Sequence, residues 1–430
     1  MYIPERYPLI TRKAYSENGR NNKVYVFSIS NPETRQVRVR KVFENRKKIY
    51  REIANRLSLG QQILIILNFV DRAVEIYQEL KLLFPNNRIG LIHGRFIPLI
   101  RSKLEEEWLD RLGNGKGSDR SQGSILIGTQ LLEQSLDIDG DFLLTDLAPS
   151  DLMFHRLGRV FRHKRPERLF EAEAWIICPR FPNINSRDEL RAALGLHAKL
   201  YYDYILWRSY RLWMRRGIVT IPTDQREIIE GTYRYSISQD PEWIKEAFKA
   251  MVNSNFEKEQ KALAATGSLG WDEDKENGDD MDDEPDSTDS IPIDVIEQED
   301  EENQKAATRL QSVPTRQLLL AESVEEWNDE FVIKFLDGGE IAVNKNSREI
   351  SNKEKVKIIT EVTLRMAKVP ISKSLADEES PEWLKQVVYG RPIPITIGKN
   401  DNSVYLSNGT RTEYFYTKEC GFYKPLKKQT

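Results

Sequence analysis

Hydrophobic and polar positions along the first 180 residues predict strands and helices in turn. Residues 62–69, QILIILNF, form a continuous apolar run, typical of a strand covered on both faces. Before it, KVYVFSIS (23–30) and QVRVRKVF (36–43) alternate around a turn and predict a hairpin. The other predicted elements are helices over 41–59, 71–83 and 99–111 and strands over 88–93, 124–128, 142–146 and 172–179. This alternation predicts an α/β fold: a parallel sheet with helices on both faces and ligands at the carboxyl ends of its strands.

The rest of the chain changes character twice. Residues 187–262 are predicted to be mainly helical and are rich in Trp, Tyr and Arg. Residues 272–302 then contain 17 Asp or Glu against a single Lys, a composition that predicts a disordered linker because it offers too little apolar surface to bury. Beyond it, an amphipathic helix and the alternating runs FVIKFLDGGEIAV and VYLSNGTRTEYFYT predict a small α+β segment, in which Asn408 and Gly409 mark a hairpin turn.

The composition is that of a globular protein, with 39% hydrophobic and 30% charged residues and no apolar run long enough to span a membrane. The net charge of −3 hides an asymmetry: residues 1–250 hold 41 Lys and Arg against 31 Asp and Glu, a balance of +10, and the rest hold 23 against 36. A basic first half indicates an anionic partner such as a nucleotide or nucleic acid, although a solvated surface would give the same counts.

The start of the chain lacks a secretory-signal pattern, and its only cysteines, Cys178 and Cys420, lie far apart in the sequence. We therefore expect a cytoplasmic protein with two buried, inert thiols and neither a disulfide nor a thiolate metal site.

The most distinctive stretch runs from Gly128 to His163. It reads GTQLLEQSLDID (128–139) and then DFLLTDLAPSDLMFHRLGRVFRH (141–163). A small-residue turn follows a buried strand, acidic residues come next, and Arg156, Arg159, Arg162 and His163 are expected on one helix. Arg159 and Arg162 would then share a helix face, so that two guanidinium groups could converge on one anion.

These residues resemble motifs V and VI in the second RecA-like domain of superfamily-2 helicases, in the form found in the CRISPR-associated helicase-nuclease of type I interference systems. NFVDRAVEIYQEL (68–80) resembles that family's motif IV, and LIHGRF (91–96) supports the match. IPTDQREIIEGTY (221–233) and KECGF (418–422) resemble its segment after the motor and its closing hairpin. One position departs, because the family usually has Gln where this chain has His155.

The resemblance implies five parts. They are a junction segment at 1–22, a second RecA-like helicase domain at 23–182, a helical linker region at 183–262, a disordered acidic linker at 263–305 and a C-terminal accessory domain at 306–430. YPLITRK, near the start, resembles the stretch that joins the two motor domains, so we expect translation to begin near that junction.

For the nucleotide, the resemblance implies that Arg159 and Arg162 are arginine fingers. They would reach the γ-phosphate of ATP bound against a neighbouring domain and neutralise charge that builds during phosphoryl transfer. Asp137 would sense the ribose or couple the nucleotide to strand movement, and Arg156 would belong to the same site. A purely structural ion pair is the alternative for the two fingers.

For the nucleic acid, the resemblance implies two groups of contacts. Thr129 and Gln130 would hold a DNA phosphate at the strand-to-helix turn. Asn68, His93, Arg95 and Arg101 would lie along the path of the strand. A capping or surface role explains Asn68 and His93 nearly as well.

ATP hydrolysis in this family also needs a phosphate loop, GxxxxGK[ST], and an acidic motif that holds magnesium. GNGKGS (113–118) resembles the loop only superficially, because Gly117 follows its lysine and the segment precedes a strand. DEPD (283–286) spells the acidic motif inside the acidic run. No histidine is followed by Asp, so we expect neither the family's His-Asp nuclease site nor any other metal site in this chain.

The segment LHAKLYYDYILWRSYRLWMRR (196–216) allows two interpretations. Its aromatic and arginine residues would suit stacking and phosphate contact with single-stranded DNA. Tyr204, Trp207 and Met214 also recur at helical spacing, which favours a packed stripe for the aromatic side chains.

We therefore expect the C-terminal half of a split, ATP-dependent DNA helicase that translocates on single-stranded DNA. Its ATP and magnesium would be shared with a partner chain carrying the first RecA-like domain and possibly the His-Asp nuclease, and a CRISPR RNA-guided effector complex would be a further partner. The main alternative is a non-catalytic, truncated or internally translated DNA-binding module of the same defence system. A third, weaker alternative is an RNA helicase, against which the SLDID and IPTDQRE segments argue.

Overall fold

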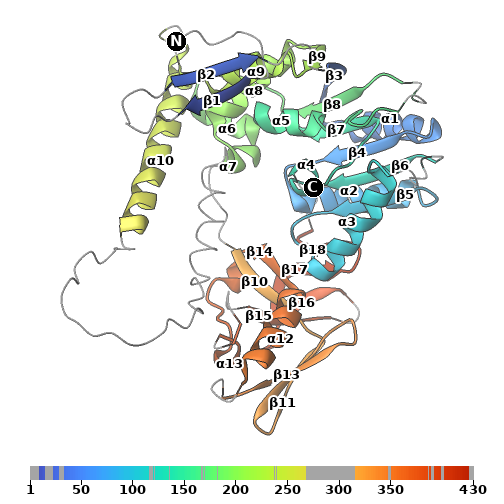
Figure 1. Ribbon diagram of the computed structural model, residues 1–430, viewed down its shortest axis with the longest axis vertical. Coiled ribbons are helices and arrows are strands. Elements are labelled where there is room, and N and C mark those ends of the chain that lie inside the picture. The colour runs from blue at the N-terminus through green and yellow to red at the C-terminus, as the bar shows by residue number, and fades with distance from the viewer. Residues whose placement is uncertain are drawn as a thin grey trace. The chain divides into compact units, whose positions relative to one another are not determined.

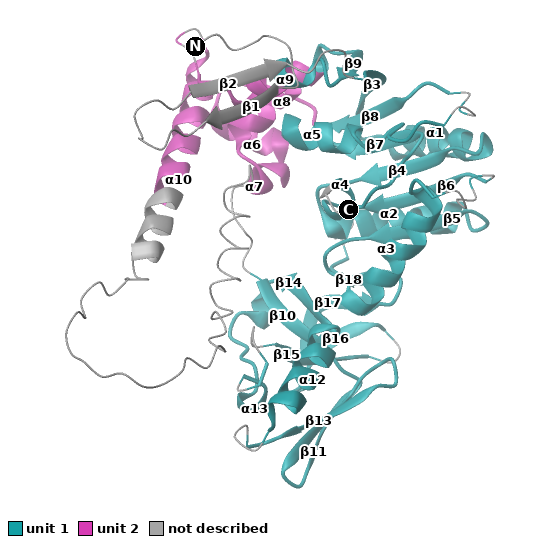
Figure 2. Ribbon diagram, in the orientation of Figure 1, with its two compact units in different colours: residues 1–178, 214–227, 313–430 teal, residues 179–213, 228–312 magenta. Residues whose placement is uncertain are grey.

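The computed structural model describes residues 9–14, 23–28, 33–115, 120, 122–134, 136–165, 168, 170–181, 183–236, 238, 240–267, 315–346, 350–385, 387–388, 392–398 and 401–425. Residues 268–305 of the predicted acidic linker, DEPD and the end of GNGKGS lie outside them. The chain divides into two compact units, one formed by 1–178, 214–227 and 313–430 and the other by 179–213 and 228–312 (Figure 2).

A seven-stranded sheet is the centre of the first unit, in the order β5-β6-β4-β7-β8-β3-β9. Its strands are β3 (Arg35–Phe43), β4 (Gln62–Ile66), β5 (Arg88–Ile92), β6 (Ser124–Gly128), β7 (Phe142–Asp146), β8 (Glu173–Cys178) and β9 (Ile218–Ile221). All neighbours are parallel except β3 and β9. The helices α1 (Arg46–Ser58), α2 (Val70–Leu83), α3 (Pro98–Leu112), α4 (Leu131–Gln134) and α5 (Ser150–Leu157) flank the sheet (Figure 1). The α/β fold with a parallel sheet is confirmed.

The apolar runs become the interior strands because both faces of the sheet are covered. All five residues of β4 are buried, as are those of β6 and β7. Ile63, Ile65 and Phe142 join side chains of α1 and α2 in one core cluster. Only strands without a polar face fit this position, which explains the unbroken runs in the sequence.

Three predicted elements differ from the structure. The run at Lys23–Ser28 (β2) pairs with Leu9–Ala14 (β1), while β3 enters the main sheet between β8 and β9, so the predicted hairpin was wrong. The first residues of the predicted helix over 41–59 belong to β3, where Val42 is buried in the core. The segment predicted to be mainly helical contains β9, which completes one edge of the main sheet.

The predicted helix carrying all the motif VI arginines also ends early. α5 stops at Leu157, and Arg159 and Arg162 follow it in a turn. There Val160 forms an isolated bridge with Gly140, and Phe161 takes a φ of 49°. The bridge draws the chain back towards the sheet and prevents the helix from continuing, so the two arginines do not share a helix face.

The second unit is helical, with α6 (Arg187–Leu194), α7 (His197–Leu200), α8 (Asp203–Met214) and α10 (Glu242–Gly267); α9 (Gln225–Tyr233) begins in the first unit. Tyr204, Ile205 and Ile244 are at its core, with Trp207 and Trp243 packed against them. The aromatic residues of α8 thus pack together, as the helical spacing favoured. Among the residues that the structure describes, no helix is long and apolar enough to cross a membrane.

The C-terminal part of the first unit contains two sheets. Six strands, in the order β14-β10-β15-β16-β17-β18, form one, and β11-β12-β13 form the other. Their bounds are β10 (Thr315–Leu320), β11 (Ser323–Trp327), β12 (Glu330–Lys334), β13 (Glu340–Asn344), β14 (Met366–Pro370), β15 (Ile393–Ile397), β16 (Ser403–Leu406), β17 (Arg411–Thr417) and β18 (Gly421–Tyr423). Helices α12 (Asn352–Thr363) and α13 (Glu382–Lys385) and a 3-10 turn, η2 (Lys373–Leu375), complete it. The predicted turn at Asn408 and Gly409 joins β16 to β17.

The end of the chain is anchored on the parallel-sheet domain through KECGF. Gly421 has a φ of +60°, and a Cβ added there would lie 3.0 Å from the Arg95 carbonyl oxygen and 3.0 Å from the His93 ring. The backbone N–H of Phe422 donates to the Arg95 carbonyl, and that of Lys424 donates to the Asp71 carboxylate. This position therefore requires glycine for both its conformation and its close approach.

We expect Gly421→Ala to lower the free energy of unfolding by about 3 kcal/mol, because it combines an unfavourable φ with a clash against the backbone. Gly409 is the matched control: its φ is +82°, but nothing lies within 4 Å of an added Cβ. Gly409→Ala should therefore cost only about 1 kcal/mol. Urea unfolding of both variants measures the difference, and equal losses would contradict the clash.

Candidate nucleotide and nucleic-acid site

The carboxyl edge of the parallel sheet is organised around Arg156, whose side chain is 1% exposed. Its Nε donates to the Glu133 carboxylate at 2.8 Å, and its Nη2 donates to Asn68 Oδ1 at 2.8 Å. Its Nη1 donates to Thr145 Oγ1 at 2.8 Å and to the Asp146 carbonyl at 3.0 Å. One buried guanidinium thus joins the ends of β4 and β7 to the turn after β6. A buried charge of this kind is tolerated only when its donors are matched in this way.

Asn68 and Asp146 extend this network. The Asn68 side chain donates to the Leu147 carbonyl at 2.9 Å, and its backbone N–H donates to the Asp146 carboxylate at 3.0 Å. Arg72 contacts the same carboxylate at 2.8 Å. Asn68 therefore holds adjacent segments together, and the residue is buried, with 8% of its surface exposed.

Arg159 lies in the turn after α5 and is largely buried. Its Nη2 donates to the Glu133 carbonyl at 2.5 Å, whereas its buried Nε has no hydrogen-bond partner among the residues that the structure describes. Burial and then the nearby Arg162 guanidinium lower the pKa of Arg159. Its guanidinium therefore combines a fixed position with unused donor capacity, as a group that receives an anion requires.

Arg162 is more accessible and is paired with Asp137. Arg162 Nε donates to the Asp137 carboxylate at 2.5 Å, and His163 lies 3.7 Å from the same carboxylate. The hydrogen bond from Arg162 holds the pKa of Asp137 below its usual range. The two residues predicted to meet the nucleotide thus neutralise each other here.

Asp139, two residues beyond Asp137, fixes the backbone of this turn. The carboxylate accepts from the Arg162 backbone N–H at 2.8 Å and from Arg165 Nε at 2.9 Å, and Arg168 also donates to it. Burial alone would raise the pKa of Asp139, but the hydrogen bonds from Arg168 and Arg165 outweigh it and keep the pKa low. The acidic spacing of motif V therefore has a structural explanation: Asp139 holds the motif VI turn while Asp137 meets its exposed arginine.

Thr129 and Gln130 lie in the turn between β6 and α4, at the same edge. Thr129 is buried and Gln130 is half-buried. Their backbone carbonyls accept from the N–H groups of Leu132 and Glu133, so the turn is closed by its own hydrogen bonds. Arg101, on α3, is half-buried and lies 3.5 Å from Glu105.

His93 and Arg95 take part in the C-terminal anchor. His93 is completely buried, and its Nδ1 accepts from the Arg95 backbone N–H at 3.2 Å. Because Nδ1 accepts, Nε2 carries the hydrogen and donates to the Cys420 carbonyl at 2.9 Å. Arg95 Nη1 contacts the Asp71 carboxylate at 2.6 Å. The His93 ring therefore presents no surface to a nucleic-acid strand in this arrangement.

Neither cysteine is placed for nucleophilic chemistry. Both are buried, and burial raises the pKa of Cys178 to about 12 and also raises that of Cys420. Among the described residues no cluster of His, Cys, Asp or Glu could hold a metal ion.

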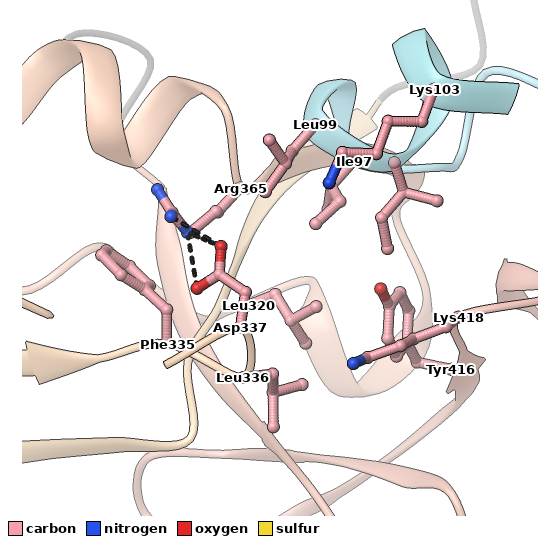
Figure 3. Close-up of a pocket in the computed structure, with 11 residues that line it drawn as sticks. Ile97, Leu99, Lys103, Leu320, Phe335, Leu336, Asp337, Arg365, Tyr416 and Lys418 are labelled. Carbon is pink, nitrogen blue, oxygen red and sulfur yellow. Dashed lines mark hydrogen bonds and ion pairs between the residues drawn. The ribbon is translucent and has the colours of Figure 1, made fainter. Parts of the chain in front are cut away.

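A pocket of about 170 Å³ lies where α3 meets the C-terminal sheets (Figure 3). Its apolar wall includes Ile97, Leu99 and Leu320, and Lys103 and Lys418 lie at its border. Arg365 and Asp337 close one side through three hydrogen bonds, at 3.3, 3.1 and 2.6 Å. No predicted site residue lines this pocket, so it is separate from the carboxyl-edge site.

Comparison with known proteins shows what this chain is similar to. Residues 59–165 match the family model described as CRISPR-associated nuclease/helicase Cas3, C-terminal. The chain is 29% identical over 236 residues to the nuclease/helicase Cas3 of Streptococcus thermophilus and 33% identical over 210 residues to the endonuclease/helicase Cas3 of Escherichia coli K12. The chain matches the C-terminal half of a Cas3-type helicase.

These matches cover 54% and 47% of this chain but only 23% and 22% of the two Cas3 proteins. The chain therefore spans about a quarter of their length. Among solved structures, a CRISPR-associated protein superposes with a TM-score of 0.67 at 21% identity, covering 98% of this chain and 44% of that one. Cas3 from T. fusca gives a TM-score of 0.60 at 19% identity, covering 94% and 45%. Both show that the fold is shared.

Sequence reasoning missed Glu133, the partner of both Arg156 and Arg159. It is 2% exposed, yet nothing in its stretch, LLEQS, predicts that the glutamate rather than the leucines would be buried. The role of Glu133 is evident only from the structure, where the turn after β6 lies beside α5 and brings the carboxylate to Arg156.

We expect Glu133→Gln to lower the free energy of unfolding by about 3 kcal/mol, because it leaves the buried Arg156 charge without its counter-ion. Glu105→Gln is the matched control, since its pair with Arg101 is partly exposed and should change stability by about 0.5 kcal/mol or less. Denaturant unfolding gives both values. A loss of similar size in the two variants would show that the Arg156 charge does not depend on Glu133.

We also expect His93 to make stability depend on pH. Burial, with a contribution from Arg95, lowers the pKa of His93 to about 3. Because the folded-state pKa lies below the unfolded value of about 6.5, the unfolded chain binds a proton first as the pH falls. The stabilisation is complete above pH 6.5 and is lost as the pH falls towards 3, by up to about 1.4 kcal/mol per pH unit.

Unfolding at pH 7 and pH 5 measures this effect as the difference between the wild-type chain and His93→Gln. The variant should be less stable at pH 7 but should lose less stability between the two pH values. His155→Gln is the control, because His155 is exposed and its replacement should leave the wild-type slope unchanged. A wild-type slope in His93→Gln would contradict the assignment.

Proposed function

We propose that this chain is the C-terminal half of an ATP-dependent motor that translocates on single-stranded DNA, with its nucleotide site completed by a first RecA-like domain on a partner chain. The observation that carries this proposal is the turn after α5. It holds Arg159 and Arg162 against the loop that joins β6 to β7, where Val160 bridges Gly140; among the described residues Arg159 has a buried donor without a partner, and Arg162 is accessible. Two arginines so placed suit an anion bound against a neighbouring domain.

The residues present fit a nucleotide phosphate on the side of this chain. The Glu133 carbonyl would hold the Arg159 guanidinium in position, and Arg159 would offer its Nε to the phosphate. Arg162 would leave Asp137 to meet the same group, which releases the Asp137 carboxylate for the ribose. ATP with magnesium supplies the transferable phosphoryl group when bound, and a phosphate loop on the partner would hold it.

Arg156 would act as a positioning residue. Its guanidinium is fully engaged with Glu133, Asn68 and the end of β7, so it has no donor to offer directly. It would instead keep the motif VI turn aligned with the turn after β6. A nucleotide that moved Arg159 would therefore displace Glu133 and, with it, the turn containing Thr129 and Gln130.

For DNA, we propose Thr129, Gln130 and Arg101 as the direct contacts. They lie after β6 and on α3, outside the anchored C-terminal hairpin. Asn68, His93 and Arg95 would support this region indirectly, because their side chains are engaged within the protein. The excess of basic residues in 1–250 supports an anionic partner.

Two relatives support the proposed ligand and partner. One T. fusca structure of similar fold is described as Cas3-ATP, with a TM-score of 0.61 at 20% identity. Another similar chain belongs to a CRISPR RNA-guided surveillance complex, with a TM-score of 0.57 at 18% identity. We propose by analogy that this chain uses ATP and joins an RNA-guided effector complex.

We expect the purified chain to show no DNA-stimulated ATPase and to gain it when the protein carrying the first RecA-like domain and its phosphate loop is added. Arg162→Ala should then reduce the rate by about 10³-fold, as loss of an arginine finger does. Arg88→Ala is the control, because Arg88 lies on the outer strand β5, separated from β7 by β6 and β4, and pairs with Glu107, so its replacement should leave the rate unchanged.

Phosphate release, followed with and without single-stranded DNA, measures these rates. Strong ATPase from the chain alone would contradict the shared site. DNA binding without ATPase in the reconstituted pair would instead favour a non-catalytic DNA-binding module.

A further inference from the structure

The hairpin formed by β11 and β12 carries an exposed tryptophan at its tip. Trp327 is 70% exposed, and among the tryptophans that the structure describes it alone is exposed. It precedes the turn at Asn328, where φ is +52°, and it pairs across the turn with Glu330. A single exposed apolar side chain is ordinary, so Trp327 marks a binding surface only together with the residues around it.

The hairpin is held firmly from behind. Phe331 stacks on Trp383 with ring centroids 4.6 Å apart, and Lys345 Nζ donates to the Asn328 carbonyl at 2.5 Å. β12 also pairs along its length with β13. The tip is therefore presented in a fixed geometry and would lose little conformational entropy on binding.

Strand register extends the apolar surface beyond the tip. Val332 lies diagonally across from Trp327 on the same face and pairs directly with Ala342 of β13. Val332 is half-buried and Ala342 is exposed, while Ile333 and Val343 point to the opposite, core-facing side. We call the surface formed by Trp327, Val332 and Ala342 the Trp327 face.

The surroundings of this face are acidic. Residues 322–345 contain seven Asp or Glu against two Lys. Both lysines are already engaged, Lys334 with Glu325 at 3.0 Å and Lys345 with Glu326 at 2.6 Å. The carboxylates of Asp329 and Glu330 have no ion-pair partner among the described residues. Such a surface repels nucleic acid and anionic membranes and attracts a cationic surface.

We propose that the Trp327 face docks onto a basic protein surface, with Trp327 inserted into an apolar pocket bordered by Lys or Arg. This inference rests on the proposed function, because we assign that surface to the RNA-guided effector complex. A complex that binds guide RNA and target DNA is rich in Lys and Arg, and those beside its channel that phosphates leave uncovered would supply the required cations. The hairpin is thus a protein-docking element, distinct from the DNA-contacting edge of the parallel sheet.

Biolayer interferometry at several salt concentrations measures the affinity of the full chain for the effector complex assembled on target DNA. Trp327→Ala should weaken binding about 30-fold, the loss expected of a central interface tryptophan. The double variant Asp329→Lys, Glu330→Lys should slow association about 10-fold and reduce its salt dependence. Tyr235→Ala is the matched control, because Tyr235 is 79% exposed on the other compact unit and should bind like the wild-type chain.

A parallel measurement with single-stranded DNA alone separates the possible outcomes. Trp327→Ala should leave that affinity unchanged, and a loss there would overturn the proposal in favour of a nucleic-acid contact. If the wild-type chain binds the complex and both hairpin variants bind equally well, the docking inference fails while the proposed function stands. If the wild-type chain does not bind the complex, the effector partnership fails, and this inference fails with it.

Discussion

The carboxyl edge of the parallel sheet depends on one buried charge. Arg156 can remain ionised at 1% exposure only because Glu133, Asn68 and the end of β7 supply acceptors from three different segments. These segments correspond to the stretches that resemble helicase motifs IV, V and VI. Their mutual alignment is therefore a condition for burying the guanidinium, and the position of Arg159, which is tied to the same Glu133, follows from it.

In the proposed function, the motif VI turn is arranged for a phosphate before any nucleotide binds. Asp139 fixes the backbone of the turn, while Asp137 neutralises the accessible Arg162. Arg159, in contrast, is positioned by a carbonyl oxygen, and within the described part of the chain no carboxylate contacts its guanidinium. The two proposed fingers would therefore respond differently to a phosphate. Arg162 must exchange one anion for another, whereas Arg159 only gains one.

Much of the fold could be predicted because the parallel sheet imposes a strong hydrophobic pattern. Strands with both faces covered, such as β4, β6 and β7, appear in the sequence as unbroken apolar runs with nearly the observed bounds. The pairing of β2 could not be predicted, since alternating runs fit many partners and only the burial of Val37 and Val39 shows that β3 belongs to the main sheet. The end of α5 was also hidden, because it depends on the long-range bridge between Gly140 and Val160.

At the site, residue types indicated anion binding, but the burial of His93 and the role of Glu133 arise from segments that meet only in three dimensions.

The anchor between His93 and Cys420 joins residues that are 327 positions apart. During synthesis, the surface around β5 and α2 must wait for the last strand, β18, before it is covered. At typical translation rates of about 5–20 residues per second, that interval is on the order of tens of seconds. Over this time Tyr77 and Phe96, which pack in the same cluster as Cys420, remain without their final partner. The nascent chain therefore exposes an apolar surface long after its parallel sheet can form, which makes it a substrate for chaperones and vulnerable to premature association with other chains.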